Sequence, residues 1–290
     1  MAKGTEVAKA SNTAVGAALD YGDFKHEGFE DTTINDLSIP FLNVMQPLSQ
    51  MVVEELIDGI KPGDLVNSVT KEILKQPVVL QPVHKEEVWV EWIPRTKGGG
   101  LVERHDPNSD VVQQVLKANN NSRIPPKDAE GKRPPFKMPN GSGNDLIETY
   151  YVYNLIMDEN GVATEGYCVL SFSSTKIRVQ KDWMTAMFTQ KGRPPMFANR
   201  TRCSTVKEKR EAGSSFNFSM QPLNATWRES LIVPDEAGMK LLVEAKEFRE
   251  MILSGLAMPD MEGASSEGGT DSSPPAPSGS KAGSVDDAPF

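Results

Sequence analysis

The sequence predicts a mainly β fold of the α+β class, built as an OB-like antiparallel barrel or a curved sheet with one or two helices. Segments rich in β-branched and aromatic residues recur through the middle of the chain, and turn-forming residues join two pairs of them. Residues 1–31 and 258–290 are instead small, polar and acidic, which indicates disordered tails on a body at 32–257.

The first strands are expected at residues 78–80 and 87–93, which are rich in β-branched and aromatic side chains. Pro77 and Pro82 bound the first of these segments, because proline is unfavourable within a central strand. Residues 119–143 are rich in Asn, Pro, Gly and Lys and are therefore expected to form a long loop.

Two β-hairpins are expected in the second half of the chain. Residues 147–157 and 167–172 are apolar segments joined through an Asp-Glu-Asn-Gly turn, and an Asn-Gly pair favours a tight hairpin. Residues 197–207 and 214–220 are expected to form the second hairpin around Glu-Ala-Gly.

Two helices accompany these strands. Residues 174–190 begin with Ser-Thr, which can cap a helix, and carry an apolar stripe at helical spacing. The side chains of that stripe are Ile177, Met184, Met187 and Phe188. A last helix is expected to begin at Pro234, since proline is favoured in a first turn, and to end at about Ser254, before Gly255.

The net charge of the 290 residues is -9, with an isoelectric point near 5.0, which argues against uniform attraction to nucleic acid. The charge is unevenly distributed, because residues 1–70 carry a net -7 and residues 258–290 a net -5. Residues 171–228 hold eleven basic and three acidic residues. A cationic region therefore lies between anionic ends, and an anionic tail that competes with nucleic acid for it suppresses loose binding.

Composition disfavours several classes of protein and site. No run of about 18 apolar residues is present, and residues 1–6 lack a signal pattern, so we expect a cytoplasmic protein without membrane contact. Cys168 and Cys203 are far apart, which indicates buried free thiols rather than a disulfide. These cysteines and the three histidines fit no zinc motif, so we expect no metal and no cofactor.

The chain also lacks the Walker A, GxSxG and HExxH patterns, so we expect no enzymatic activity. Acidic residues are plentiful, however, and some of them lie in expected strands. A metal-dependent nuclease built from scattered carboxylates therefore stays open as a less favoured alternative.

The last five residues, 286–290, combine acidic and aromatic side chains. Asp286, Asp287, Pro289 and Phe290 place two carboxylates, a rigid proline and an aromatic ring after a linker rich in Ser, Gly and Pro. A solubilising acidic tail is the simpler interpretation, but such a tail has no need of an exposed aromatic ring. An apolar pocket with a basic rim is suited to receive this group.

This ending resembles the acidic C-terminal tip of bacterial-type single-stranded DNA-binding proteins, which ends in Asp-Asp-x-Pro-Phe. The resemblance covers residues 286–290 and the linker before them. It implies that Asp286, Asp287, Pro289 and Phe290 dock on partner proteins of replication and recombination. The body is much longer than the compact bacterial protein, so the chain looks more like a divergent, phage-encoded member that acts in the host cytoplasm.

A protein that holds single strands needs cations for the phosphates and aromatic rings on which bases stack. Trp89 shares a partly polar strand face with Arg95 and Lys97, although packing of Trp89 under a loop is an equally compatible interpretation. Tyr151 and Tyr153 share a face of the first hairpin and are further stacking candidates, and the sequence leaves open which face meets solvent.

Basic residues of the region 171–228 are expected to contact phosphates. On the first helix, the polar stripe opposite the apolar one is either a solvated face or part of a cationic site. Arg200 and Arg202, two residues apart on one strand face, form a pair suited to follow a phosphate chain. The candidate contacts are Lys176, Arg178, Lys181, Arg193, Arg200, Arg202 and Lys207.

These features predict a non-enzymatic single-stranded DNA-binding protein that coats and protects exposed strands in DNA replication, recombination and repair. Its partners would be single-stranded DNA and replication or recombination proteins recruited through the tip, and a homo-oligomer is compatible with the sequence. The main alternative is an assembly or interaction protein without nucleic-acid binding, whose basic middle would meet an acidic partner.

Overall fold

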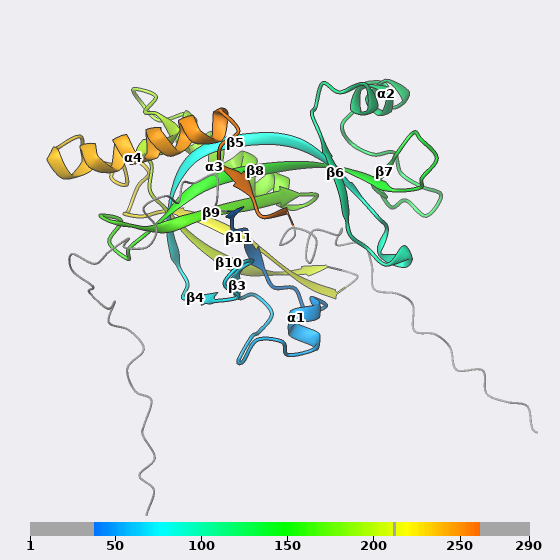
Figure 1. The fold of residues 1–290 in the computed structure, drawn as a ribbon, viewed down its shortest axis with the longest axis horizontal. Coiled ribbons are helices and arrows are strands. Elements are labelled where there is room, and N and C mark those ends of the chain that lie inside the picture. Colours follow the sequence, from blue (N-terminus) through cyan, green and yellow to red (C-terminus); the bar gives the residue numbers. More distant parts are fainter. Residues whose placement is uncertain (1–37, 211–212, 262–290) are drawn as a thin grey trace, which may run out of the picture.

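The computed structural model describes residues 38–210 and 213–261, which form three sheets with helices on both faces of the largest one (Figure 1). Within these ranges the helices are α1 (Gln50–Val53), α2 (Asp110–Ala118), α3 (Lys176–Phe188) and α4 (Glu236–Leu253), with one-turn 3-10 segments η3 (Arg95–Lys97) and η4 (Met196–Ala198). None of these helices is long and apolar enough to cross a bilayer. The predicted mainly β, α+β class is confirmed, with more helices than expected.

The largest sheet is built around two long strands, β5 (Val78–Trp92) and β8 (Asp145–Met157). The other strands are β6 (Leu101–His105), β7 (Phe136–Lys137), β9 (Thr164–Ser173), β10 (Thr201–Arg210) and β11 (Gly213–Pro222). Their order is β11-β10-β5-β8-β7, with β6 also paired to β5 and β9 to β8, all antiparallel. These pairings confirm both predicted hairpins. No pairing among the described strands joins the two ends of this order, so a closed OB-type barrel stays a prediction.

β5 is one strand of 15 residues, whereas two shorter strands were predicted at 78–80 and 87–93, with Pro82 after the first. Pro82 lies within the strand, and the register against β8 shifts between Pro82 and His84. Proline cannot donate to the ladder, and a bulge is a position where a missing donor is tolerated. The strand continues through the proline because antiparallel pairing with β8 extends along its length.

Two smaller sheets pack beside the largest one. β2 (Leu42–Val44), β3 (Leu65–Asn67) and β4 (Ile73–Leu74) form an antiparallel sheet. β1 (Ser38–Ile39) pairs in parallel with β12 (Met258–Pro259), so the two ends of the described chain meet.

The folded body extends beyond residue 257, which was the predicted boundary. Pro259 is buried within β12, and the backbone N–H of Asp260 donates to the carbonyl oxygen of Ile39 at 2.8 Å. The predicted boundary at residue 257 therefore lies within the described body. The predicted N-terminal arm and most of the predicted tail lie outside the described residues.

Both faces of the largest sheet are covered by helices. In β8, Tyr151 and Tyr153 belong to the core that includes Phe248 of α4, whereas Tyr150 and Val152 belong to the core that includes α3. Alternate residues of a strand point to opposite faces. α3 and α4 therefore lie on opposite sides of the sheet, and the expected helices are confirmed at both positions.

α2 was not predicted. Its Val112, Val115 and Leu116 are buried at helical spacing and form a separate core with Trp89 and Phe136. The helix has only nine residues, so its apolar stripe covers little more than two turns and is hard to separate from the loops around it.

The two cysteines are buried free thiols, as predicted. Burial raises the pKa of Cys203 to about 12 and also raises that of Cys168. Both thiols stay protonated at neutral pH, and a protonated, buried thiol is a poor nucleophile and a poor metal ligand.

Candidate nucleic-acid interface

α3 turns one face to the sheet and the other outward. Trp183 and Met187 are buried, and the indole N–H of Trp183 donates to Oγ1 of Thr201 at 3.1 Å. Arg178 and Lys181 lie on the opposite side and are exposed. The arrangement follows from helical periodicity, because the anchoring residues recur every three or four positions.

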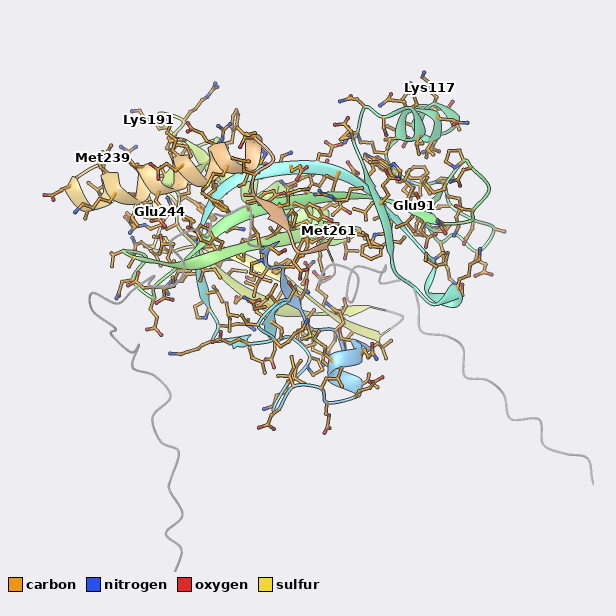
Figure 2. The ribbon with its side chains drawn as sticks, in the orientation of Figure 1. Glu91, Lys117, Lys191, Met239, Glu244 and Met261 are labelled. Carbon is orange, nitrogen blue, oxygen red and sulfur yellow. The ribbon has the colours of Figure 1, made fainter. Side chains whose placement is uncertain are left out.

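α3 and the turn that follows it are rich in basic residues. Residues 174–193 contain five basic residues and a single acidic residue, Asp182. Asp182 lies 3.8 Å from Arg178, but both side chains are exposed and such a pair contributes little. Lys191, labelled in Figure 2, and Arg193 follow the helix and are exposed as well. Because α3 is about 20 Å long, these charges form a track rather than a point.

Phe188 is an exposed aromatic residue at the end of this track. It is 67% exposed, and the guanidinium of Arg193 lies 5.5 Å from its ring centroid, a cation–π distance. The prediction that Phe188 belongs to the apolar stripe was wrong, because the buried stripe runs through Trp183 and Met187 and Phe188 lies further round the helix. An exposed ring beside cations is a surface on which an unpaired base can stack.

β10 adds charge on the same side of the sheet. Nζ of Lys176 lies 5.7 Å from the ring centroid of Phe218, which pairs across the ladder with Thr205. Lys207 is exposed, two residues along from Thr205 and therefore on the same strand face. We call the following set the cationic face: Lys176, Arg178, Lys181, Lys191, Arg193 and Lys207.

Arg202 points to the other side of β10. It lines an open groove of about 730 Å³ together with the polar side chains of Ser204, Gln221 and Asn224. Arg202 and Lys207 are five positions apart in β10, and an odd separation places two strand residues on opposite faces. The groove offers one guanidinium among neutral polar groups, and it is separate from the cationic face.

Arg200 has a structural role in the described fold. Its guanidinium donates three hydrogen bonds, to the carbonyl oxygens of Ser230 (3.1 Å), Gly161 (3.0 Å) and Leu231 (3.0 Å). Its partial burial lowers its pKa. The prediction of an outward pair with Arg202 was wrong, because β10 begins after Arg200 and strand alternation does not extend to it.

Trp89, Tyr151 and Tyr153 are buried, so the prediction that they offer their rings to bases was wrong. Trp89 packs on Phe136 with ring centroids 5.8 Å apart, and the hydroxyl of Tyr153 donates to Glu86 at 2.8 Å. Burial raises the pKa of Tyr151 to about 12. Strand alternation correctly placed Tyr151 and Tyr153 on one face but gave no information on the helices that cover the sheet. The predicted strand face shared by Trp89, Arg95 and Lys97 was wrong, because β5 ends at Trp92 and η3 follows it.

Lys97 is exposed but lies apart from the cationic face. It follows the end of β5 at Trp92, whereas β10 pairs with the opposite end of that strand, at residues 78–80. Arg95 lies in the same 3-10 segment, and its side chain is not among those described. The predicted partner-binding residues of the segment 286–290 lie outside the described residues as well.

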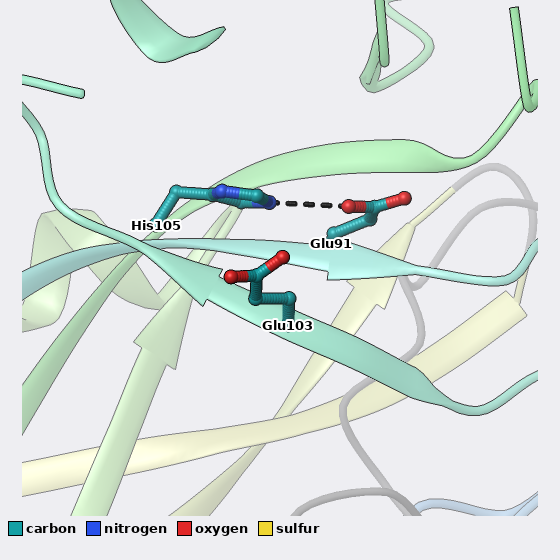
Figure 3. Close-up of side chains that lie close together, drawn as sticks. All are labelled: Glu91, Glu103 and His105. Atoms are coloured by element: carbon teal, nitrogen blue, oxygen red, sulfur yellow. Dashed lines mark hydrogen bonds and ion pairs between the residues drawn. The ribbon is translucent and has the colours of Figure 1, made fainter. Parts of the chain in front are cut away.

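One group of side chains in the described ranges has the chemistry of a metal ligand set. Oxygen or nitrogen atoms of Glu91, Glu103 and His105 lie within 4.8 Å of one another (Figure 3). The spacing of histidines and cysteines in the sequence gives no sign of this group. Pairing of β5 with β6 is what brings the three residues together.

The fold and the site define a mainly β protein with an exposed cationic face on one side of its largest sheet. The chain belongs to the Pam3 phage gp34-like protein family, whose model matches residues 8–257. No curated protein and no solved structure gives a significant match. Membership of this family agrees with the expected phage origin.

Proposed function

We propose that this protein binds single-stranded DNA along the cationic face. The observation that carries the proposal is the exposed ring of Phe188, which lies beside Arg193 at the end of a basic helix face. Unpaired strands expose the faces of their bases and a flexible phosphate chain. Aromatic side chains stack on the bases, and the cations around them bind the phosphates. In duplex DNA the base faces are stacked, so the same surface has less to contact.

Acidic residues are few in the stretch 174–193, which supports attraction of a polyanion. Asp182 is the one carboxylate between residues 174 and 193, against five basic side chains. A protein partner with an acidic surface would also be attracted to such charge. The exposed aromatic ring favours nucleic acid, because stacking on Phe188 adds an interaction that an acidic protein surface does not need.

We extend the proposal to the cellular role. The protein coats and protects exposed strands during replication, recombination and repair in the host cytoplasm, and its segment 286–290 recruits partner enzymes. Support for recruitment comes from the similarity of this segment to the acidic tip of single-stranded DNA-binding proteins. An OB-type closure of the sheet belongs to the same proposal.

Fluorescence anisotropy with a labelled oligo-dT strand tests the binding site. Phe188→Ala is expected to weaken binding roughly five- to 150-fold, because stacking of one base contributes about 1–3 kcal/mol. Leu253→Ala is the matched control, since Leu253 is also an exposed apolar side chain but lies at the end of α4, on the other side of the sheet. Equal affinity of both variants would contradict the assignment of Phe188.

The same titration separates the alternatives. Affinity should fall with salt at a log–log slope of about -0.7 per phosphate neutralised, and a flat response would contradict a phosphate track. Absence of binding in dilute buffer would favour an interaction protein that meets no nucleic acid. Degradation of the strand on addition of magnesium or manganese would favour a nuclease, and preference for duplex DNA would contradict the proposal.

A further inference from the structure

Glu91, Glu103 and His105 lie on one face of the β5–β6 ribbon, in the lobe that also contains α2. Glu91 pairs across the ladder with Glu103, and Trp89 pairs with His105. All four side chains therefore share a face, with His105 diagonal to Glu91. Figure 3 shows the carboxylate of Glu103 turned toward the space between His105 and Glu91.

The charge balance of this group is unfavourable without a cation. Two carboxylates stand directly opposite each other in the ladder, a position in which like charges destabilise a sheet. The side chain of Glu91 is only 5% exposed, so water screens it poorly. Two basic side chains of neighbouring strand positions pair elsewhere, since Arg104 of β6 lies 3.9 Å from Glu86 and Lys137 of β7 pairs with Asp145.

The geometry of the group suits a metal ion. Nε2 of His105 lies 3.1 Å from Oε2 of Glu91. Two ligand atoms at that separation, each about 2.1 Å from one ion, subtend roughly 95° at the ion, which is an ordinary angle between neighbouring ligands. The three side chains come close enough for small rotations of Glu103 to complete the set, because all ligand atoms lie within 4.8 Å.

Neighbouring polar groups orient the buried ligand. Nδ2 of Asn144 donates to Oε1 of Glu91 at 2.6 Å and leaves Oε2 to face His105. Hydrogen bonds of this kind fix ligands around metal centres. The indole N–H of Trp89, which lies on the same strand face beside His105 in the ladder, is buried and has no partner in the described structure.

We propose that Glu91, Glu103 and His105 bind one divalent transition-metal ion, of the class of Zn²⁺, Mn²⁺ or Co²⁺. One imidazole nitrogen with two carboxylate oxygens favours these ions over Mg²⁺ and Ca²⁺, which prefer oxygen ligands alone. Three protein ligands leave coordination positions for water. The ion neutralises the opposed carboxylates and ties β6 to β5 at the base of the α2 lobe.

Titration of the full-length protein with Zn²⁺ by calorimetry, and with Co²⁺ by visible absorption, tests this proposal. We expect one ion per chain and Co²⁺ d–d bands that show nitrogen and oxygen ligands. Glu103→Gln and His105→Ala should each weaken binding about tenfold or more. Glu103 is exposed, so its substitution is compatible with folding, whereas Glu91 is too buried to serve as the test residue.

Two variants elsewhere in the chain serve as controls. Glu130→Gln removes an exposed carboxylate and His84→Asn removes a histidine, and neither residue belongs to the group. Both should bind Zn²⁺ and Co²⁺ like the wild type. Absence of binding at millimolar metal, or equal affinity in Glu103→Gln and the wild type, would overturn the proposal and leave a plain hydrogen-bonded Glu91–His105 pair.

A stability measurement gives an independent result. Because an ion that binds only the folded state stabilises it, Zn²⁺ should raise the Tm of the wild type and not that of Glu103→Gln. A rise of the same size in both proteins would place the ion elsewhere. The site does not depend on strand binding, so failure of either proposal leaves the other standing.

Discussion

Arg200 and Arg202 show how two residues of one type, two positions apart, acquire different roles. Arg200 donates hydrogen bonds to three backbone carbonyl groups. Through these bonds its side chain connects the loop after β8 with the segment before α4. Arg202 is exposed and lines the groove beside β10. The two side chains differ in role because β10 starts between them. The alternation of side chains along a strand therefore applies to Arg202 and not to Arg200.

Substitution of each arginine by alanine separates these roles. Arg200→Ala should lower the free energy of unfolding by about 2–4 kcal/mol, since partly buried carbonyls lose a charged donor. Arg202→Ala should change stability by no more than about 0.5 kcal/mol. Urea unfolding measures both values, and equal losses would contradict the structural role of Arg200.

At the scale of elements, the start of α4 is set by two residues that act together. The side chain of Asp235 caps the helix by accepting a hydrogen bond from the backbone N–H of Gly238 at 2.8 Å. A Cβ at Gly238 would lie 1.8 Å from the carbonyl oxygen of Val233. The glycine therefore lets the preceding segment pass close to the first turn.

Gly238→Ala should destabilise the protein although alanine is the better helix former. Alanine gains about 1 kcal/mol from helix propensity, but the clash with the Val233 carbonyl forces a backbone shift that typically costs more, for a net loss of about 1–3 kcal/mol. Met239→Ala, at an exposed position next to it, should be nearly neutral. Thermal or urea unfolding compares the two, and stabilisation by Gly238→Ala would show that the close approach is absent.

The elements that the sequence predicted well are those specified locally. The hairpins follow from turn residues and strand composition. α3 follows from apolar periodicity, and α4 follows from the proline at its start and the glycine after its end. The continuity of β5 through Pro82 and the covering of both sheet faces depend on residues far away in the sequence. For that reason Trp89 and Tyr153 looked like exposed platforms, whereas Phe188 looked like part of the core.

The candidate sites, too, could be predicted only where their residues are close together in the sequence. The basic residues of the cationic face were predicted, because charge clustering is visible in the sequence itself. The group of Glu91, Glu103 and His105 was not, since it exists only through the register between β5 and β6. No local spacing rule relates a residue of one strand to its neighbours across the ladder.

At the scale of the whole molecule, opposite charges are separated along the chain. The basic region 171–228 forms much of the cationic face, while residues 258–290 carry a net -5. An anionic segment attached to a cationic surface raises the local concentration of a competitor for that surface. Under the proposed function, the acidic segment would weaken loose contacts with nucleic acid and would recruit a partner protein.

Removal of residues 286–290 tests this division between body and tail. We expect unchanged or slightly higher affinity for oligo-dT, because a competing anionic segment is lost, and we expect capture of host replication enzymes to disappear. Phe290→Ala is the matched variant, since it keeps Asp286 and Asp287 and should lose partner binding at unchanged DNA affinity. Anisotropy and pull-down measure the two activities separately. Undiminished capture of those enzymes by the truncated chain would remove recruitment from the proposed function. The proposal of strand binding would stand, because it assigns that activity to the cationic face and not to residues 286–290.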